Sequence, residues 1–147
     1  MISRTGIHAT LALSFLAQLR SGEYAGAAKI AREVGAPQNY LGKLLKQLAE
    51  LGLLESQKGF GGGFRLARKS VRITLYDILE PVERVSKWNG CFMGRSRCDE
   101  NSPCALHDRW SRIRDEYMGF LKATTLADVA NGDAKVQKKP VRHRRRT

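Results

Sequence analysis

The chain of 147 residues lacks a long hydrophobic run. A membrane-spanning helix needs about 18 or more mostly apolar residues, and the apolar stretch near the N-terminus is broken by Ser14 and Gln18. That stretch also lacks a small-residue cleavage site, so it does not have the pattern of a secretory signal. We therefore expect a cytoplasmic protein that does not act at a membrane.

Acidic residues are few. Lys and Arg number 26 against 14 Asp and Glu, which gives a formal net charge of +12. Residues 135–147 hold seven of the basic residues and no acidic one, which leaves +5 for residues 1–134. A charge of this size predicts a polyanionic partner, most commonly nucleic acid. The basic tail alone is equally typical of a disordered end that adds solubility.

Cysteines are also scarce, and their number is odd. The three, Cys91, Cys98 and Cys104, lie within fourteen residues of one another. An odd number in a chain without a secretory signal argues against a disulfide framework. The clustering favours a metal site or a thiol sensor.

The hydrophobic pattern predicts a mainly α-helical chain. A first helix is expected over residues 3–22, with Ser3 as its N-cap. Four apolar residues recur every four positions and predict its buried stripe: Ile7, Leu11, Phe15 and Leu19. Further helices are expected over residues 27–34 and from Pro37 to just before Gly52.

The next segment predicts a small β-hairpin. Two β-prone stretches, residues 53–56 and 64–67, are separated by a glycine-rich turn. Three helices followed by such a hairpin predict a winged helix-turn-helix over residues 1–73. The glycines do not match a phosphate-binding loop, so a nucleotide site is not expected.

In a winged helix-turn-helix, the third helix buries its leucines and offers its polar face to the major groove, while the hairpin contacts the backbone. The expected DNA-binding residues are Gln38, Asn39, Tyr40, Lys43 and Lys46 on the helix, with Lys58, Gly61, Gly62 and Arg65 on the hairpin. The partner is then a double-stranded DNA operator. A helical module that binds another protein is the alternative that this pattern leaves open.

Residues 74–130 are expected to form a sensor and dimerisation region. Thr74, followed by Asp77, has the spacing of a capping box for a short helix that Pro81 should end or bend early. Residues 86–102 show no periodicity and are expected to be a loop.

A long fifth helix is expected to begin at Ser102 and Pro103. Its apolar residues are spaced four and three apart, which predicts a coiled-coil-like seam: Leu106, Trp110, Ile113, Tyr117, Phe120 and Leu121. Thr125 should cap a last short helix over residues 126–130. Residues 131–147 are expected to be a basic, disordered tail.

His107 follows Cys104 by three residues, so the expected helix start would place both on one face of its first turn. The helix N-terminus would then favour a thiolate at Cys104. Three thiolates and one imidazole can ligate an iron–sulfur cluster or a zinc ion. The six- and five-residue gaps between the cysteines are wider than the pairs of structural zinc sites, which favours a larger centre.

Other uses of these residues remain open. The thiols can act as a metal-free redox switch, or they can merely pack. A Cys–His nucleophile lacks a third orienting residue and an oxyanion motif, so we do not expect an enzyme. The alternatives to a cluster-sensing regulator are a cluster-free regulator that senses through thiols and a helical interaction module with a structural zinc.

The chain resembles a family of bacterial winged-helix iron–sulfur transcription regulators that includes IscR, NsrR and RirA. The resemblance covers roughly residues 1–130. It is carried by Tyr40 with Leu41 and the leucine-rich run that follows, by KGFGGGFRL in the hairpin, and by CDENSPCALHDRW.

The resemblance implies a homodimer whose fifth helices cross, bound to an operator with two half-sites. It also implies a cluster held by Cys91, Cys98 and Cys104. IscR-like members add the histidine that is His107 here. NsrR-like members take an acidic ligand from the partner's first helix, and the corresponding place lies near His8, which is therefore an alternative fourth ligand.

Two features depart from the family pattern. The first cysteine gap is six residues, where IscR-like members commonly have five, so the cluster can be [2Fe-2S] or [4Fe-4S]. IscR-like members also carry a discriminating acid early in the recognition helix, where this chain has Gly42. A cluster-gated change of DNA sequence preference is therefore not carried over.

Overall fold

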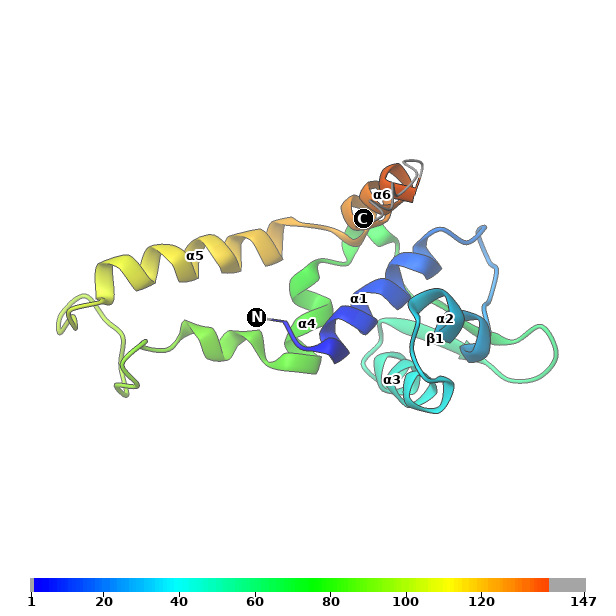
Figure 1. The fold of residues 1–147 in the computed structure, drawn as a ribbon, viewed down its shortest axis with the longest axis horizontal. Helices are drawn as coiled ribbons and strands as arrows, with labels where there is room; N and C mark the ends of the chain where they lie inside the picture. The colour runs from blue at the N-terminus through cyan, green and yellow to red at the C-terminus, as the bar shows by residue number, and fades with distance from the viewer. Residues whose placement is uncertain (1, 138–147) are drawn as a thin grey trace, which may run out of the picture.

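The structure is a computed structural model, and it describes residues 2–137. The elements follow in the order α1 (Arg4–Ala17), α2 (Ala27–Val34), α3 (Gln38–Glu50), β1 (Leu54–Gln57), β2 (Gly63–Leu66), η1 (Ser70–Arg72), α4 (Leu75–Glu83), η2 (Val85–Asn89), α5 (His107–Ala123) and α6 (Leu126–Gln137). The winged helix-turn-helix gathers at one end with α6, while α5 extends away as a long arm (Figure 1). No helix within residues 2–137 has the length and hydropathy required to cross a membrane.

α1 begins as predicted, but it ends earlier and buries a different face. The Ser3 side chain accepts a hydrogen bond from the Gly6 N–H at 3.1 Å. The helix ends at Ala17, because the next two N–H groups bind carbonyls only three residues back and a turn follows. The predicted stripe is wrong at Ile7 and Leu11, which are 49% and 38% exposed.

Small side chains account for this difference. The buried face of α1 consists of Gly6, Ala9, Ala12, Leu13, Ser14 and Leu16. Leu13 and Ala12 lie in one core with residues of α2, α3, α4 and α6. Short side chains let these helices approach closely, which counting large apolar residues does not detect.

α2 and α3 form the helix-turn-helix as predicted. α2 ends at Val34, and the C-cap that follows, Gly35, has a positive φ of 73°, which favours glycine at this position. Pro37 is the N-cap of α3 rather than its first residue. Four leucines of α3 are buried: Leu41, Leu44, Leu45 and Leu48.

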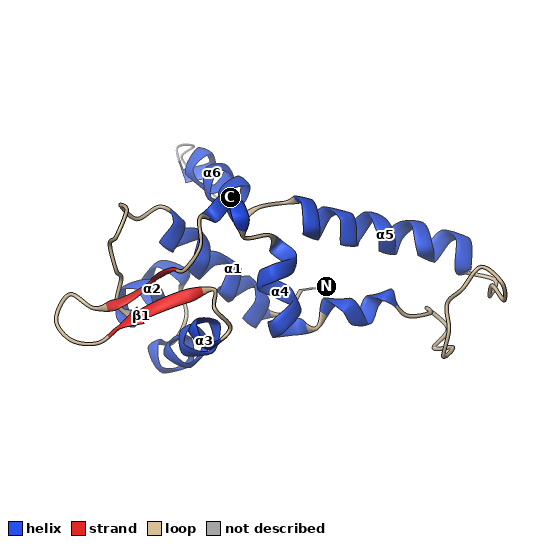
Figure 2. Ribbon diagram, turned by 180° about the vertical axis from the view of Figure 1, so that it is seen from behind, coloured by secondary structure: helices blue, strands red, loops and turns tan. Residues whose placement is uncertain are grey.

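The wing is an antiparallel hairpin that begins one residue later and ends one residue earlier than the predicted limits. Leu54 pairs with Leu66, and Gln57 pairs with Gly63. Its turn projects beyond the body of the protein beside α3 (Figure 2). Ala25 extends the sheet through two backbone hydrogen bonds with Phe64, of 2.9 and 2.8 Å. A side chain at residue 63 would overlap the Ala25 carbonyl, so glycine is required there.

The capping box of α4 is confirmed, whereas the expectation that Pro81 would end the helix is wrong. Thr74 and Asp77 exchange hydrogen bonds of 3.1 and 2.9 Å between side chain and backbone. α4 continues two residues beyond Pro81 and ends at Glu83. Its buried face, which includes Ile78 and Leu79, supports the helix where proline removes a backbone donor.

Three further limits differ from the expectations. Residues 85–89 form η2 rather than loop, and α5 begins at His107 rather than at residue 102. α6 is longer than expected and includes residues 131–137, which were expected to be disordered. The rest of the basic tail, residues 138–147, lies outside the described residues.

Candidate functional site

The recognition helix α3 presents a polar face opposite its buried leucines. Gln38, Asn39, Lys43 and Lys46 are all exposed. Amide side chains can pair with base edges, and lysines can neutralise phosphates. The fold thus leaves these four predicted side chains available to a polyanion.

Tyr40 has a different environment. It is half-buried, and its hydroxyl donates a hydrogen bond to Thr5 Oγ1 at 3.1 Å. The same hydroxyl lies 3.4 Å from His8 Nδ1, and the two rings meet edge to face at 5.6 Å. Tyr40 therefore connects α3 to α1, and its contact with DNA stays a prediction.

The predicted DNA-binding residues of the wing include an exposed lysine, Lys58, and an arginine, Arg65, that is paired with an acid. Lys58 is exposed beside the glycines 61 and 62 near the turn. Arg65 donates to Glu55 at 2.8 Å and lies over the Tyr24 ring at 4.6 Å. The hydrogen bond to Glu55 raises the pKa of Arg65. Phe60, which sequence reasoning missed, is fully exposed at the turn, and its place between glycines was the available signal.

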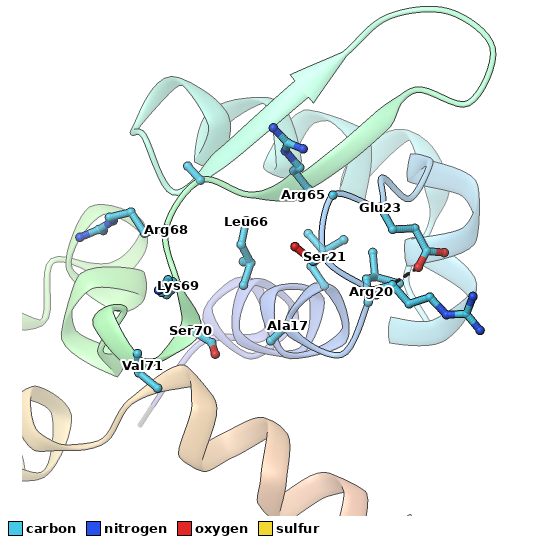
Figure 3. Close-up of a pocket in the computed structure, with 14 residues that line it drawn as sticks. Ala17, Arg20, Ser21, Glu23, Arg65, Leu66, Arg68, Lys69, Ser70 and Val71 are labelled. Atoms are coloured by element: carbon cyan, nitrogen blue, oxygen red, sulfur yellow. Dashed lines mark hydrogen bonds between the residues drawn. The ribbon is translucent and has the colours of Figure 1, made fainter.

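A cleft of about 510 Å³ lies at the base of the wing, between the end of α1 and residues 65–71. Four cations line it: Arg20, Arg65, Arg68 and Lys69. Figure 3 shows Arg20 and Arg68 pointing away from each other, and Arg65 is paired as described above. The cations do not converge on one point, so the cleft does not have the geometry of an anion site.

The cysteine loop, residues 91–106, lies at the far end of the arm formed by α5 (Figure 1). It brings the four predicted ligands together as two pairs. The sulfurs of Cys91 and Cys104 are 3.9 Å apart. Cys98 Sγ lies 3.4 Å from His107 Nδ1, and His107 is only 8% exposed.

Cys104 precedes α5 rather than lying in its first turn, which corrects the prediction. The turn that joins them is closed by the His107 N–H, which donates to the Cys104 carbonyl at 3.0 Å. Upstream, the Asp99 carboxylate accepts the N–H groups of Asn101 and Ser102, at 3.1 and 2.9 Å. These local bonds hold residues 99–104 outside the helix.

Each donor pair has the spacing of two ligands on one tetrahedral metal. Bonds of about 2.3 Å to sulfur and about 2.0 Å to nitrogen place two such ligands about 3.5–3.8 Å apart. Within residues 2–137, no three His, Cys, Asp or Glu side chains are placed to hold a single metal ion. The two pairs also lie close to each other, because Cys91 contacts Cys98 as well. Two neighbouring pairs are the arrangement that a centre with two metals would need.

The backbone of the loop lowers the pKa of Cys91. The largest contribution is a hydrogen bond from the Arg95 backbone, and Met93 adds a second. Hydrogen bonds with the thiols of Cys104 and Cys98 lower it further. The thiolate form, which binds metals and reacts with oxidants, is therefore favoured at Cys91.

A tether, defined as residues 84–90, connects α4 to the cysteine loop. The Trp110 indole N–H donates to the Gly90 carbonyl at 2.8 Å, and Arg114 donates to the Asn89 carbonyl at 3.1 Å. Phe92 packs edge to face on Trp110 at 5.4 Å. Trp110 was expected only as a seam residue, and Arg114 was missed, because side-chain bonds to backbone carbonyls leave no pattern in the sequence.

His8, the alternative fourth ligand, lies on α1 beside Tyr40 and away from the cysteines of its own chain. Ligation by His8 across a dimer stays a prediction.

An apolar groove of about 470 Å³ runs between the N-terminal region and the arm. It is lined by Ile2, Ile7, Trp88, Trp110, Ile113, Arg114 and Tyr117. Ile113 and Phe120, both in the predicted seam, are 60% and 54% exposed. Leu121, at the end of the seam, is fully buried. Within residues 2–137, the seam is therefore only partly covered.

A recognition helix with a free polar face, a glycine-rich wing and a distal cysteine loop define the class of winged-helix DNA-binding regulators. Residues 2–132 match the Rrf2 family, described as an iron-dependent transcriptional regulator. The chain belongs to this family, and it is accordingly a DNA-binding transcription regulator.

The chain is 31% identical to an HTH-type transcriptional regulator of Aquifex aeolicus over 92% of this chain and 94% of the relative. It is 29% identical to the Escherichia coli regulator IscR over 71% of this chain, a match that spans 64% of IscR. The structure of CymR, the global cysteine regulator of Bacillus subtilis, superposes with a TM-score of 0.73 at 27% identity, covering 89% of this chain and 96% of CymR.

Proposed function

We propose that the protein is a homodimeric transcription regulator that senses redox state, iron or nitric oxide through a [2Fe-2S] cluster. The observation that carries the proposal is the placement of four soft ligands as two pairs. Each iron of a [2Fe-2S] cluster takes two protein ligands, which suits Cys91 with Cys104 and Cys98 with His107. The cluster, when bound, supplies a centre whose oxidation state or loss reports the signal.

The residues of the chain have distinct roles in this proposal. The three thiolates and the His107 imidazole hold the cluster and join the cysteine loop to the start of α5. Trp110 and Arg114 fix the tether by binding its carbonyls. A change in ligation then alters the loop, and DNA affinity changes only as far as the two states bind DNA differently.

The DNA side of the proposal uses α3 and the wing. Gln38 and Asn39 read bases, while Lys43, Lys46 and Lys58 contact phosphates. The exposure of these side chains supports the assignment. Arg65, already paired with Glu55, contributes less to phosphate binding than Lys58.

The dimer forms through the arm. The groove beside α5 is mostly apolar, and no other part of residues 2–137 covers it or the exposed seam residues. Members of this family act as dimers. A second copy that crosses α5 covers this surface and sets the spacing of two recognition helices on two half-sites.

A cluster-free thiol sensor is the second candidate function. The 3.9 Å separation of the Cys91 and Cys104 sulfurs and the lowered pKa of Cys91 favour oxidation of this pair to a disulfide. The likeness to a cysteine regulator points the same way. Both candidate functions use the same DNA interface. They differ in whether the cysteines bind a cluster or form a disulfide.

The test is a binding titration in defined cysteine states. Duplexes that the anaerobically purified protein selects from a random pool serve as the ligand, and affinity is measured by fluorescence anisotropy. The cluster proposal predicts at least a tenfold difference between cluster-loaded and cluster-free protein, both kept reduced. Equal affinities in these two states, with a change only on diamide oxidation, would replace the cluster by the thiol sensor. Failure to select any duplex would contradict both.

A further inference from the structure

The first turns of α1 lie between the recognition helix and the segment that leads to the cysteines. On one side, the Ser3 backbone N–H and hydroxyl both donate to Glu83 Oε1 at 2.7 Å. On the other side, the Tyr40 hydroxyl donates to Thr5 Oγ1 at 3.1 Å. Glu83 is the last residue of α4, and Tyr40 is the third residue of α3. We use the name joint for residues 3–8, which are the N-cap and the first five residues of α1.

The Glu83 carboxylate lies directly against Gly6 in the first turn of α1. A Cβ on Gly6 would meet Glu83 Oε1, so a larger residue at position 6 would displace this carboxylate from its place beside Ser3. The Ser3 hydroxyl accepts the Gly6 N–H while it donates to Glu83. The carboxylate, the cap and the first helical turn therefore form one chain of hydrogen bonds, and the positive end of the helix favours the carboxylate charge.

From Glu83, the backbone leads to Cys91 through the tether. Arg84 takes a left-handed conformation with φ of 52°, which turns the chain sharply after α4. The Ser86 N–H and hydroxyl both donate to the Glu80 carboxylate, which anchors the tether to α4. At its other end, the tether is held by Trp110 and Arg114 of α5, which donate to the carbonyls of Gly90 and Asn89. Because both ends are held, we expect the tether and Glu83 to move together.

The other side of the joint reaches the recognition helix through Tyr40. Its hydroxyl lies between Thr5 and His8, and its ring packs on that of His8. The neighbouring Gln38 and Asn39 remain exposed. Tyr40 therefore orients the first turn of α3, where those two side chains are carried.

We propose that Glu83 and Tyr40 are positioning residues that couple the cysteine loop to the recognition helix through the joint. The inference rests on the proposed function, since it gives the route by which a change at the cysteines reaches DNA. A displaced tether moves Glu83, the loss of the Glu83–Ser3 bonds loosens the joint, and the Thr5–Tyr40 contact passes the change to α3. Such a route requires a structural element that can adopt two arrangements, and in this proposal the joint is that element.

Hydrogen exchange on the DNA-free, full-length protein tests the route directly. Glu83→Ala removes the acceptor on α4 and should raise exchange of residues 38–42 roughly fivefold, the order expected for one net hydrogen bond. Tyr40→Phe should raise exchange there by a similar factor. The double variant should show no further increase, because both changes break one route.

Matched variants keep this test decisive. Glu83→Gln retains an acceptor for Ser3 and should stay within about twofold of the parent protein. Tyr76→Phe removes a hydroxyl from a half-buried residue near the start of α4, whose ring lies beside Lys122, and it should leave residues 38–42 unchanged. If Glu83→Ala raises exchange only in α1 and near the tether, while residues 38–42 keep the parent rate, the coupling is refuted.

A second readout separates positioning from a merely structural role. The ratio of DNA affinities between the cluster-loaded and cluster-free states should fall at least fivefold toward one in Tyr40→Phe, with iron content unchanged. A structural defect would instead weaken both states equally and preserve the ratio, which would overturn the proposal. If the parent protein itself shows a ratio of one, the proposed sensing fails, and the exchange result still decides whether the joint couples α4 to α3.

Discussion

At the residue scale, charge pairing distinguishes two cations that look alike in the sequence. Lys58 and Arg65 both flank the glycine turn of the wing, and the sequence predicted both as DNA contacts. In the structure, Arg65 is bound to Glu55 and packed on Tyr24, whereas Lys58 is exposed near the turn. A cation that is already paired with a carboxylate contributes less binding free energy when it contacts a phosphate, because it must first break that ion pair.

Lys58→Ala should therefore weaken duplex binding and reduce the slope of log affinity against log salt by about one, since one fewer counterion is released. Arg65→Ala should change the slope less. Lys87→Ala, an exposed cation on η2, is the matched control. Anisotropy titrations at several salt concentrations measure all three variants, and an unchanged slope in Lys58→Ala would remove Lys58 from the interface.

The second residue-scale prediction concerns Cys104. Cys104→Ala leaves Cys91 without its paired sulfur, so we expect loss of bound iron and loss of signal response in a promoter–reporter assay. Because Cys104 lies outside the hydrophobic core, the thermal unfolding midpoint of the metal-free protein should not change. A variant that responds to the signal like the parent protein would contradict the cluster account.

At the element scale, the capping signals and the apolar spacing of α3 were read correctly from the sequence, and long-range packing was not. The Ser3 cap, the Thr74–Asp77 capping box and the leucines of α3 depend on residues three or four positions apart. The buried face of α1 depends on helices far along the chain that pack against Ala9 and Ala12. The apolar stripe predicted for α1 instead includes two exposed residues, of which Ile7 borders the groove beside the arm.

The same limit applies to the cysteine site. The sequence predicted these four residues as ligands, but it could not show that they lie as two pairs, Cys91 with Cys104 and Cys98 with His107. That pairing depends on where α5 begins, and hydrogen bonds within the loop shift its start to His107. A proline after a cap-forming serine predicted an earlier start, because local propensity ignores such loop bonds.

The capping box of α4 gives the element-scale prediction. Thr74→Ala removes the side-chain acceptor of the Asp77 N–H and should lower the free energy of unfolding by about 1 kcal/mol. Thr74→Ser keeps the hydroxyl and should recover most of that loss. Urea denaturation monitored by circular dichroism measures both variants, and an equal loss in the two would show that the cap does not stabilise α4.

At the scale of the whole molecule, the winged helix and the cysteine loop lie at opposite ends of an elongated chain (Figure 1). Within residues 2–137, the apolar groove and the seam residues Ile113 and Phe120 on the arm stay exposed. In the proposed dimer, a second copy would cover this surface, and the distance between the two recognition helices would depend on the arm.

Ile113→Glu places a charge in the middle of this surface and should shift the protein from dimer to monomer at micromolar concentration, because burying an unpaired charge is strongly unfavourable. Val71→Glu is the matched control, since Val71 is 61% exposed, as Ile113 is 60% exposed, but lies on η1 away from the groove. Sedimentation velocity measures both. A dimeric Ile113→Glu variant with parent-like affinity would place the interface elsewhere.

The central claim is that the two ligand pairs hold a [2Fe-2S] cluster. The most direct test is the iron, acid-labile sulfide and zinc content of the protein purified without oxygen, with its visible absorption spectrum. The account predicts a coloured protein with about two irons and two sulfides per chain and no zinc. A colourless protein that takes up no iron on reconstitution, or one that holds a single zinc per chain, would contradict it.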